Sequence, residues 1–353
     1  MKWSAAFACL LFAVPGFASA EEQVDAETLI SEGISAYDTG DYAAAILAFE
    51  KALDIDPANY TAAYELALTH TAAGNLESCI DLARKYVRKV RNEPEYLQAH
   101  SQLSVLQASC HSQAGETSEA LEVFRAALKQ DPDHYALNFN IAITLAQDGQ
   151  SDAALEHVIK AAVADPAHQS PYYVLGSLYY DKGMVVEGLL AYLVFLQREF
   201  NTQRAAMASQ FAIELAFSSV SQEDEALVIS LAHLEGSDDD PLLPLEMYLS
   251  LNAASKIEGD SIKEPVHESI AELLASFVKA SNDLTEDVDP DSFVASYLLP
   301  DVAAIGEAGI DEPFAWFVAS AAGVGGAAEW LDANPEQVDA LVQHFQFQAA
   351  RRD

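Results

Sequence analysis

The residues best suited to chemistry do not complete a recognised catalytic set. His267 and Glu268 begin the zinc-protease pattern, in which two histidines four positions apart bind the metal, but Ala271 stands where the second histidine is needed. The glycine-rich stretch 323–328 fits only the loosest dinucleotide-binding pattern, because no strand-like segment precedes it. We therefore expect a tight turn between helices at 323–328, and we predict no catalytic residue, no metal ligand and no cofactor.

Two acidic runs carry oxygen ligands of the kind that calcium prefers. They lie at 238–240 and 287–291. In the second run, Ser292 stands where a calcium loop needs its turn glycine, and Leu298 stands where it needs its closing glutamate. We therefore expect both runs to be solvated surface segments, with a loop at 236–241.

The first twenty residues have the pattern of a secretory signal peptide. Lys2 precedes an apolar run over 3–14, and a small-residue cleavage site follows at 18–20. The run is shorter than the roughly 18 residues that a membrane span needs, which argues against the alternative of a transmembrane anchor. We expect residues 1–20 to be removed and the remaining chain to be exported, to the periplasm or alternatively to the medium, without membrane insertion.

Two cysteines, Cys79 and Cys110, follow the predicted cleavage site. In an exported protein, an even number of cysteines is often joined in disulfides. The alternative is a pair of buried thiols, since cysteine packs well as a small core residue. Both interpretations stay open from the residue types alone.

The chain is strongly acidic, with 18 Lys and Arg residues against 55 Asp and Glu residues and a formal net charge of −37. Removal of 1–20 takes away Lys2 and no acid, so the charge becomes −37 − 1 = −38. Such a surface repels nucleic acid phosphates and anionic lipid headgroups, so we expect no nucleic acid partner. Five basic residues at 84–91 either stabilise a helix end or bind an anionic partner.

A period of 34 residues organises the first half of the chain. Five residues in one period, Gly115, Ala120, Phe124, Ala127 and Pro132, are followed 34 positions later by Gly149, Ala154, Val158, Ala161 and Pro166. With small residues where helices touch and proline where the second helix ends, the chain resembles tetratricopeptide repeat proteins, in particular exported bacterial ones. The resemblance implies an all-α solenoid of about five helix–turn–helix repeats over 21–201, followed by a helical domain over 202–353.

The second repeat is longer than the others. Gly74 and Gly115 are 41 residues apart instead of 34, and the extra seven residues correspond to about two helical turns. We therefore expect one elongated helix pair at about 76–90 and 94–112. The two cysteines would lie at similar heights on this pair, which suits a disulfide.

Beyond residue 201 the period is lost, but apolar spacing and helix breakers still predict helices. The predicted ranges are about 203–220, 242–257, 265–281, 291–308, 313–322 and 335–347. The stretch 226–234 suits either a helix or a short strand. Aromatic residues such as Trp316 and Trp330 indicate that this region has a core of its own.

In tetratricopeptide repeats, the first helix of each repeat lines a concave groove, and the resemblance assigns such positions to this chain. The partner-binding residues that it implies are Tyr37, Tyr64, Phe139, Ile143, Gln147, Tyr173, Ser177 and Tyr180. None is Lys or Arg, so the basic clamp by which co-chaperones hold a C-terminal carboxylate is missing. An aromatic and apolar groove suits an amphipathic helix or an extended peptide. The alternative is a groove filled by the next repeat or by the C-terminal region.

These features favour a protein–protein interaction scaffold or adaptor in the cell envelope, which binds a peptide or helix of a partner protein. Two alternatives stay open. One is an enzyme with an unrecognised active site in 202–353. The other is a structural subunit whose groove is permanently occupied.

Overall fold

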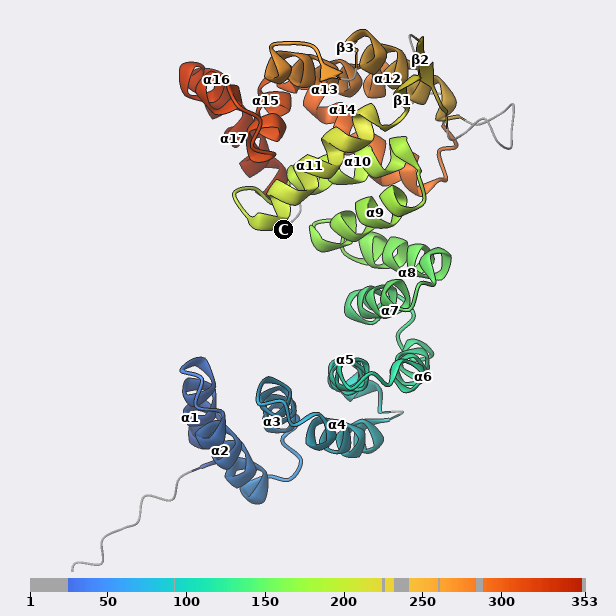
Figure 1. Cartoon of the computed structure of the whole chain (residues 1–353). Coiled ribbons are helices and arrows are strands. Elements are labelled where there is room, and N and C mark those ends of the chain that lie inside the picture. Colours follow the sequence, from blue (N-terminus) through green and yellow to red (C-terminus); the bar gives the residue numbers. More distant parts are fainter. Residues whose placement is uncertain are drawn as a thin grey trace, which may run out of the picture. The chain divides into compact units, whose positions relative to one another are not determined.

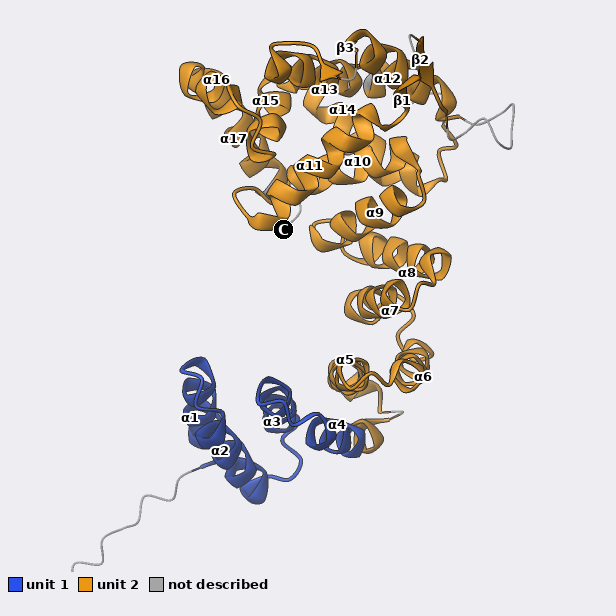
Figure 2. Ribbon diagram, viewed as in Figure 1, with its two compact units in different colours: residues 1–86 blue, residues 87–353 orange. Residues whose placement is uncertain are grey.

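The structure is a computed structural model of the chain, which describes residues 25–91, 93–223, 226–231, 241–259, 261–283 and 288–350. Within these ranges the chain is almost entirely helical (Figure 1). It divides into two compact units between Tyr86 and Val87, inside one helix (Figure 2). The predicted signal peptide lies outside the described residues, as do the acidic run 238–240 and Asp287.

The helices follow the predicted order along the chain. The repeat helices are α1 (Ala26–Asp38), α2 (Tyr42–Ile55), α3 (Tyr60–Ala72), α4 (Leu76–Val90), α5 (Leu97–Gln113) after a 3-10 turn at Pro94–Tyr96, α6 (Thr117–Leu128), α7 (Tyr135–Gln147), α8 (Ser151–Ala164), α9 (Ser170–Asp181) and α10 (Val185–Leu196). Beyond them lie α11 (Gln203–Ser218), β1 (Val220–Glu223), β2 (Ala226–Ile229), α12 (Leu243–Ser255), β3 (Ile257–Glu258), β4 (Ser261–Ile262), α13 (Val266–Asp283), a π-helical turn at Val294–Leu298, α14 (Leu299–Glu307), α15 (Asp311–Ala321), α16 (Ala327–Ala333) and α17 (Pro335–Ala350).

Unit 1 contains α1, α2, α3 and most of α4. The carboxylate of Asp25 caps α1 by accepting a hydrogen bond from the backbone N–H of Thr28 at 2.8 Å. Gly33 on α1 faces the ring of Phe49 on α2, and a Cβ atom at Gly33 would lie only 2.6 Å from that ring. The small residue predicted at this position therefore lets the two helices approach closely.

In unit 2, helices α5 to α10 form three pairs that follow one another in a row (Figure 1). The turns inside these pairs contain Gly115, Gly149 and Gly183, whose φ angles of 80°, 76° and 70° suit glycine. Helix α4 has 15 residues and α5 has 17, whereas the other repeat helices have 12 to 14. The predicted elongation is confirmed for α5, which follows the 3-10 turn Pro94–Tyr96, whereas α4 is only one residue longer than α2 and α8.

Helix α10 lies at the centre of unit 2, and all 12 of its residues are buried. It packs against α9, α11 and α14, which explains why its sequence is apolar on almost every side. Gly188 takes a place where repeats usually have alanine, because a Cβ atom there would lie 2.9 Å from Leu215 on α11. Repeats and C-terminal helices thus share one hydrophobic core, although the 34-residue period ends near residue 201.

Three features of the C-terminal region differ from the sequence-based expectation. The first helix ends at Ser218 instead of 220, and β1 then pairs with β2 in an antiparallel hairpin, so the ambiguous stretch begins as a strand. A second hairpin, β3 and β4, follows α12. Helix α16 was not expected, because its 7 residues are too few to show a helical period.

The glycine-rich stretch forms the interhelical turn that the sequence predicts, between α15 and α16. Gly323 and Gly326 have φ angles of 79° and 90°. A Cβ atom at Gly326 would also lie 2.6 Å from Nδ1 of His267. Among the described helices, none combines the length and the apolar character that a membrane crossing requires.

Candidate protein-binding surfaces

The predicted binding residues of unit 2 lie on α7 and α9, which are the first helices of neighbouring repeats and contact each other. On α7, Phe139 and Ile143 are half-buried and Gln147 is exposed. Their spacing of four places all three on one side of the helix. The opposite side is buried, with Ile141 and Leu145 in the core. We call the three residues the α7 face.

The ring of Phe139 has an aromatic neighbour on the same helix. Tyr135 stacks on Phe139 with ring centroids 5.7 Å apart and an interplanar angle of 8°. The ring of His168 also packs on Tyr135, with ring centroids 4.7 Å apart. Burial raises the pKa of Tyr135 far above its ordinary value, so this hydroxyl stays neutral. The α7 face therefore begins with a fixed aromatic platform.

On α9, the predicted residues are engaged inside the chain. Tyr173 packs edge-on against Phe195 of α10 at 5.2 Å. The hydroxyl of Tyr180 donates a hydrogen bond to Glu214 of α11 at 2.9 Å, and this bond is the main reason why its pKa is raised. The hydroxyl groups of Ser177 and Tyr192 also interact. Tyr173, Ser177 and Tyr180 therefore contact α10 or α11, but all three stay half-buried, as Phe139 and Ile143 are.

In unit 1, the structure brings the two predicted tyrosines near each other. Tyr37 and Tyr64 are both half-buried. Partial burial raises the pKa of Tyr64, and the nearby charges of Glu65 and Tyr37 raise it further. Burial and the charge of Asp38 likewise raise the pKa of Glu65. This side of unit 1 is aromatic and acidic, as the sequence predicts.

Each of the two cysteines is fully buried and disulfide-bonded. The hydroxyl of Thr71 lies 3.3 Å from the sulfur of Cys79. That Cys79 and Cys110 are joined to each other stays a prediction. Among the basic residues at 84–91, Arg84 donates to Asp81 at 2.9 Å, which supports the stabilising role for that residue.

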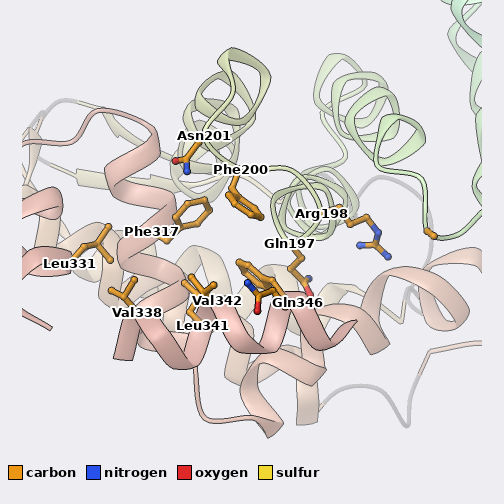
Figure 3. Close-up of a pocket in the computed structure, with 12 residues that line it drawn as sticks. Gln197, Arg198, Phe200, Asn201, Phe317, Leu331, Val338, Leu341, Val342 and Gln346 are labelled. Atoms are coloured by element: carbon orange, nitrogen blue, oxygen red, sulfur yellow. The ribbon is translucent and has the colours of Figure 1, made fainter. Parts of the chain in front are cut away.

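An apolar cleft of about 480 Å³ in unit 2 was not predicted (Figure 3). It lies between the turn after α10 and helices α15, α16 and α17. Its apolar lining is Phe200, Phe317, Leu331, Val338, Leu341, Val342 and Phe345, joined by the polar or small residues Ala167, Gln197, Arg198, Asn201 and Gln346. The apolar spacing of α17 is visible in the sequence, but the turn that faces it comes from over 130 residues earlier.

A second, more polar cleft of about 470 Å³ borders α13 and α15. Trp316 and Trp330 stack at its edge with centroids 4.9 Å apart, and the amino group of Lys279 lies 3.0 Å from the carboxylate of Asp311. His267, which begins the incomplete zinc pattern, packs on Trp316 at 5.6 Å. Across the ranges that the structure describes, no three His, Cys, Asp or Glu side chains are grouped to hold a metal ion.

Paired antiparallel helices, a positive-φ glycine in each turn and a 34-residue period define a helical repeat protein. The family described as Tetratricopeptide repeat matches residues 36–103 and 112–185. Residues 36–103 and 112–185 are therefore tetratricopeptide repeats, as the sequence predicts. Proteins built from these repeats generally act as scaffolds for interactions with other proteins.

The chain is similar to several known proteins over its repeats. It is 29% identical over 136 residues to "Small glutamine-rich tetratricopeptide repeat-containing protein 2" of Mycosarcoma maydis, a stretch that covers 38% of this chain and 37% of that protein. A thermophilic repeat protein of Thermus thermophilus is 22% identical, with 53% of this chain and 98% of that chain covered and a TM-score of 0.41. PilF of Pseudomonas aeruginosa is 20% identical, with 54% of this chain and 82% of that chain covered and a TM-score of 0.44.

Proposed function

We propose that this protein is an interaction scaffold of the cell envelope, and that it binds a peptide or helix of a partner protein on the α7 face. The observation that carries the proposal is the contrast between α7 and α9. Phe139, Ile143 and Gln147 keep accessible surface on one side of α7, whereas the half-buried Tyr173 and Tyr180 of α9 also contact α10 and α11. The region for contact is therefore centred on α7 instead of extending evenly to α9.

The chemistry of the α7 face suggests the kind of partner. Phe139 and Ile143 offer apolar contact area, and Gln147 offers an amide that both donates and accepts hydrogen bonds. No cation lies among the predicted binding residues to hold a terminal carboxylate. An amphipathic helix or an extended segment with one apolar side fits such a surface.

Site-specific photocrosslinking in living cells tests the binding surface. A photoreactive amino acid is placed at Phe139 or at Gln147, and as a control at Val163 on α8, which is 45% exposed. We expect the same partner protein to be captured from Phe139 and from Gln147 but not from Val163. Capture from none of the positions, or equally from all three, would contradict binding on the α7 face.

The location in the envelope rests on the sequence pattern of residues 1–20 and is tested separately. Cells that make the protein are separated into cytoplasmic, periplasmic and secreted fractions, and the N-terminus of the purified protein is sequenced. We expect the protein outside the cytoplasm with Glu21 as its first residue. A cytoplasmic protein that starts at Met1 would overturn the location and leave the scaffold proposal standing.

A further inference from the structure

The apolar cleft of unit 2 has the properties of a second docking site, apart from the α7 face. Phe200 is 47% exposed and Val342 is 41% exposed, although both side chains line the cleft. In Figure 3 the rings of Phe200 and Phe317 point toward the apolar side of α17, with Val338 and Val342 across from them. A chain that folds alone normally covers such side chains, so large exposed apolar groups around a cavity indicate a ligand or partner.

The turn that carries Phe200 is anchored on its first side by Arg198. The guanidinium of Arg198 donates a hydrogen bond to the backbone carbonyl of Val194 at 2.7 Å and forms an ion pair with Asp301 of α14. It also lies 4.4 Å from the ring centroid of Tyr172. Only 4% of this side chain is exposed, so the position of the turn is set by buried contacts.

On its second side, the same turn is anchored by the start of α11. The hydroxyl of Thr202 accepts a hydrogen bond from the backbone N–H of Ala205 at 3.1 Å and caps the helix. Between the two anchors, Asn201 has a φ angle of 58°, a left-handed conformation that is uncommon for residues with a Cβ atom. The fixed turn holds Phe200 at the cleft before any partner binds, which lowers the entropy cost of binding.

The charge around the cleft selects the partner. Between Lys279 and Arg351 the sequence contains no lysine or arginine. Helices α14 to α17 carry eight acidic residues in that interval, namely Asp301, Glu307, Asp311, Glu312, Glu329, Asp332, Glu336 and Asp339. Asp332 and Asp339 are exposed and directly follow the lining residues Leu331 and Val338, and the exposed Glu336 lies two residues before Val338. We call these three carboxylates the acidic rim. An approaching cation is therefore attracted to α16 and α17, which carry part of the cleft lining, and an anion is repelled.

We infer that the apolar cleft binds a segment of another protein that inserts aliphatic or aromatic side chains and carries lysine or arginine beside them. A fatty acid fits poorly, because the guanidinium of Arg198, which lines the cleft, is already paired with Asp301. A second copy of this chain also fits poorly, since two molecules with a net charge of −37 repel each other. A basic segment with an apolar centre matches both the lining and the rim.

A binding assay with defined peptides and the full-length protein tests the inference. The probe is a fluorescent 12-residue peptide with a Leu-Phe centre between lysines, and it is compared with a peptide that has glutamates in place of the lysines. A third peptide has serines in place of Leu-Phe. We expect fluorescence anisotropy to show binding of the first peptide, with affinity at least roughly tenfold weaker for each of the other two.

Three variants locate the binding. Val342→Asp puts a charge into the cleft at a partly exposed position, and Glu336→Lys with Asp339→Lys reverses the rim. Leu251→Asp is the matched control, because Leu251 is 59% exposed on α12 and does not line the cleft. We expect the affinity for the basic peptide to fall at least roughly tenfold in Val342→Asp, to fall less in the rim variant and to stay unchanged in Leu251→Asp. Circular dichroism melting checks that each variant is folded.

Several results would overturn the inference. These are no binding of the basic peptide, equal binding of the acidic peptide, or binding that Val342→Asp leaves unchanged in a folded protein. Light scattering of the purified protein measures its oligomeric state and so tests whether a second copy of the chain occupies the cleft. A dimer that Val342→Asp dissociates would assign the cleft to a second copy of the chain instead of a basic partner.

Discussion

Gly176 on α9 is a residue at which one added methyl group is expected to lower the stability of the fold. A Cβ atom there would lie 2.7 Å from the ring of Tyr192, which is buried on α10. We expect Gly176→Ala to lower the free energy of unfolding by about 1–3 kcal/mol, although alanine is the better helix former. Gly306 on α14 is the control, because its nearest contact would be the carbonyl oxygen of Val278 at 3.7 Å. Gly306→Ala should raise the free energy by about 0.5–1 kcal/mol in the same urea titration, and equal effects would contradict the packing explanation.

His157 on α8 links stability to pH. Burial lowers its pKa from 6.5, and Lys160 lowers it further, while Nδ1 lies 3.0 Å from the amide oxygen of Asn138. The unfolded chain therefore binds more protons than the folded chain just below pH 6.5. The stability from this histidine is complete above its unfolded pKa and is lost as the pH falls through that value toward the lower folded pKa.

The measurement compares wild type with His157→Gln, because acidification also neutralises many carboxylates and changes the stability of any acidic protein. Urea unfolding at about pH 7.5 and about pH 5 gives the change for each protein. On acidification, the free energy of unfolding should therefore become less favourable by a larger amount in wild type than in His157→Gln. Identical changes in both proteins would show that burial of His157 does not contribute.

At the scale of elements, the sequence was most informative where a local pattern decides the structure. The 34-residue period located the helix pairs, and the seven extra residues located the long helix α5 with the 3-10 turn before it. The sequence left a short strand open at 226–234, where β2 forms, but it did not predict the two hairpins, because strand pairing depends on partner residues, such as Val220 and Ile229, that no helical period can indicate.

For the candidate sites too, the sequence indicates which residues share one helix side, but not which distant elements contact them. The resemblance assigned Phe139, Ile143 and Gln147 to the groove, and helix periodicity explains why all three lie on one side of α7. It could not show that α11 engages Tyr180, since Glu214 comes from outside the repeats. The apolar cleft was missed for a related reason, because Phe200 and Val342 meet only through the packing of distant elements.

Helix α10 provides a prediction at the same scale. All of its side chains are buried, whereas α6 and α8 in the same unit each have exposed residues along one side. Backbone amides of buried elements exchange with solvent only when larger parts of the structure open. We expect hydrogen exchange followed by mass spectrometry to show slower exchange for peptides from α10 than for peptides from α6 and α8. Faster exchange in α10 would contradict its place in the shared core.

At the scale of the whole molecule, the net charge of −37 acts on every part of the chain. Like charges are closer together in the folded state than in the unfolded chain, so their repulsion lowers stability. Salt screens this repulsion, because the Debye length falls from about 30 Å at 0.01 M to about 10 Å at 0.1 M. Few ion pairs offset the effect, since only 18 lysine and arginine residues face 55 acids.

We therefore expect the melting temperature to rise by a few degrees as sodium chloride increases from about 0.01 M to about 0.5 M, with most of the rise at the low end. Chloride is the suitable salt, because sulfate also strengthens apolar burial and would raise the melting temperature for a different reason. Calorimetry at fixed pH measures the shift, and sucrose at matched osmolality is the uncharged control. A melting temperature that stays constant or falls with chloride would mean that the folded chain spaces its carboxylates widely enough to avoid repulsion. The acidic rim of the apolar cleft would then attract a basic partner only weakly, because the same potential underlies both effects.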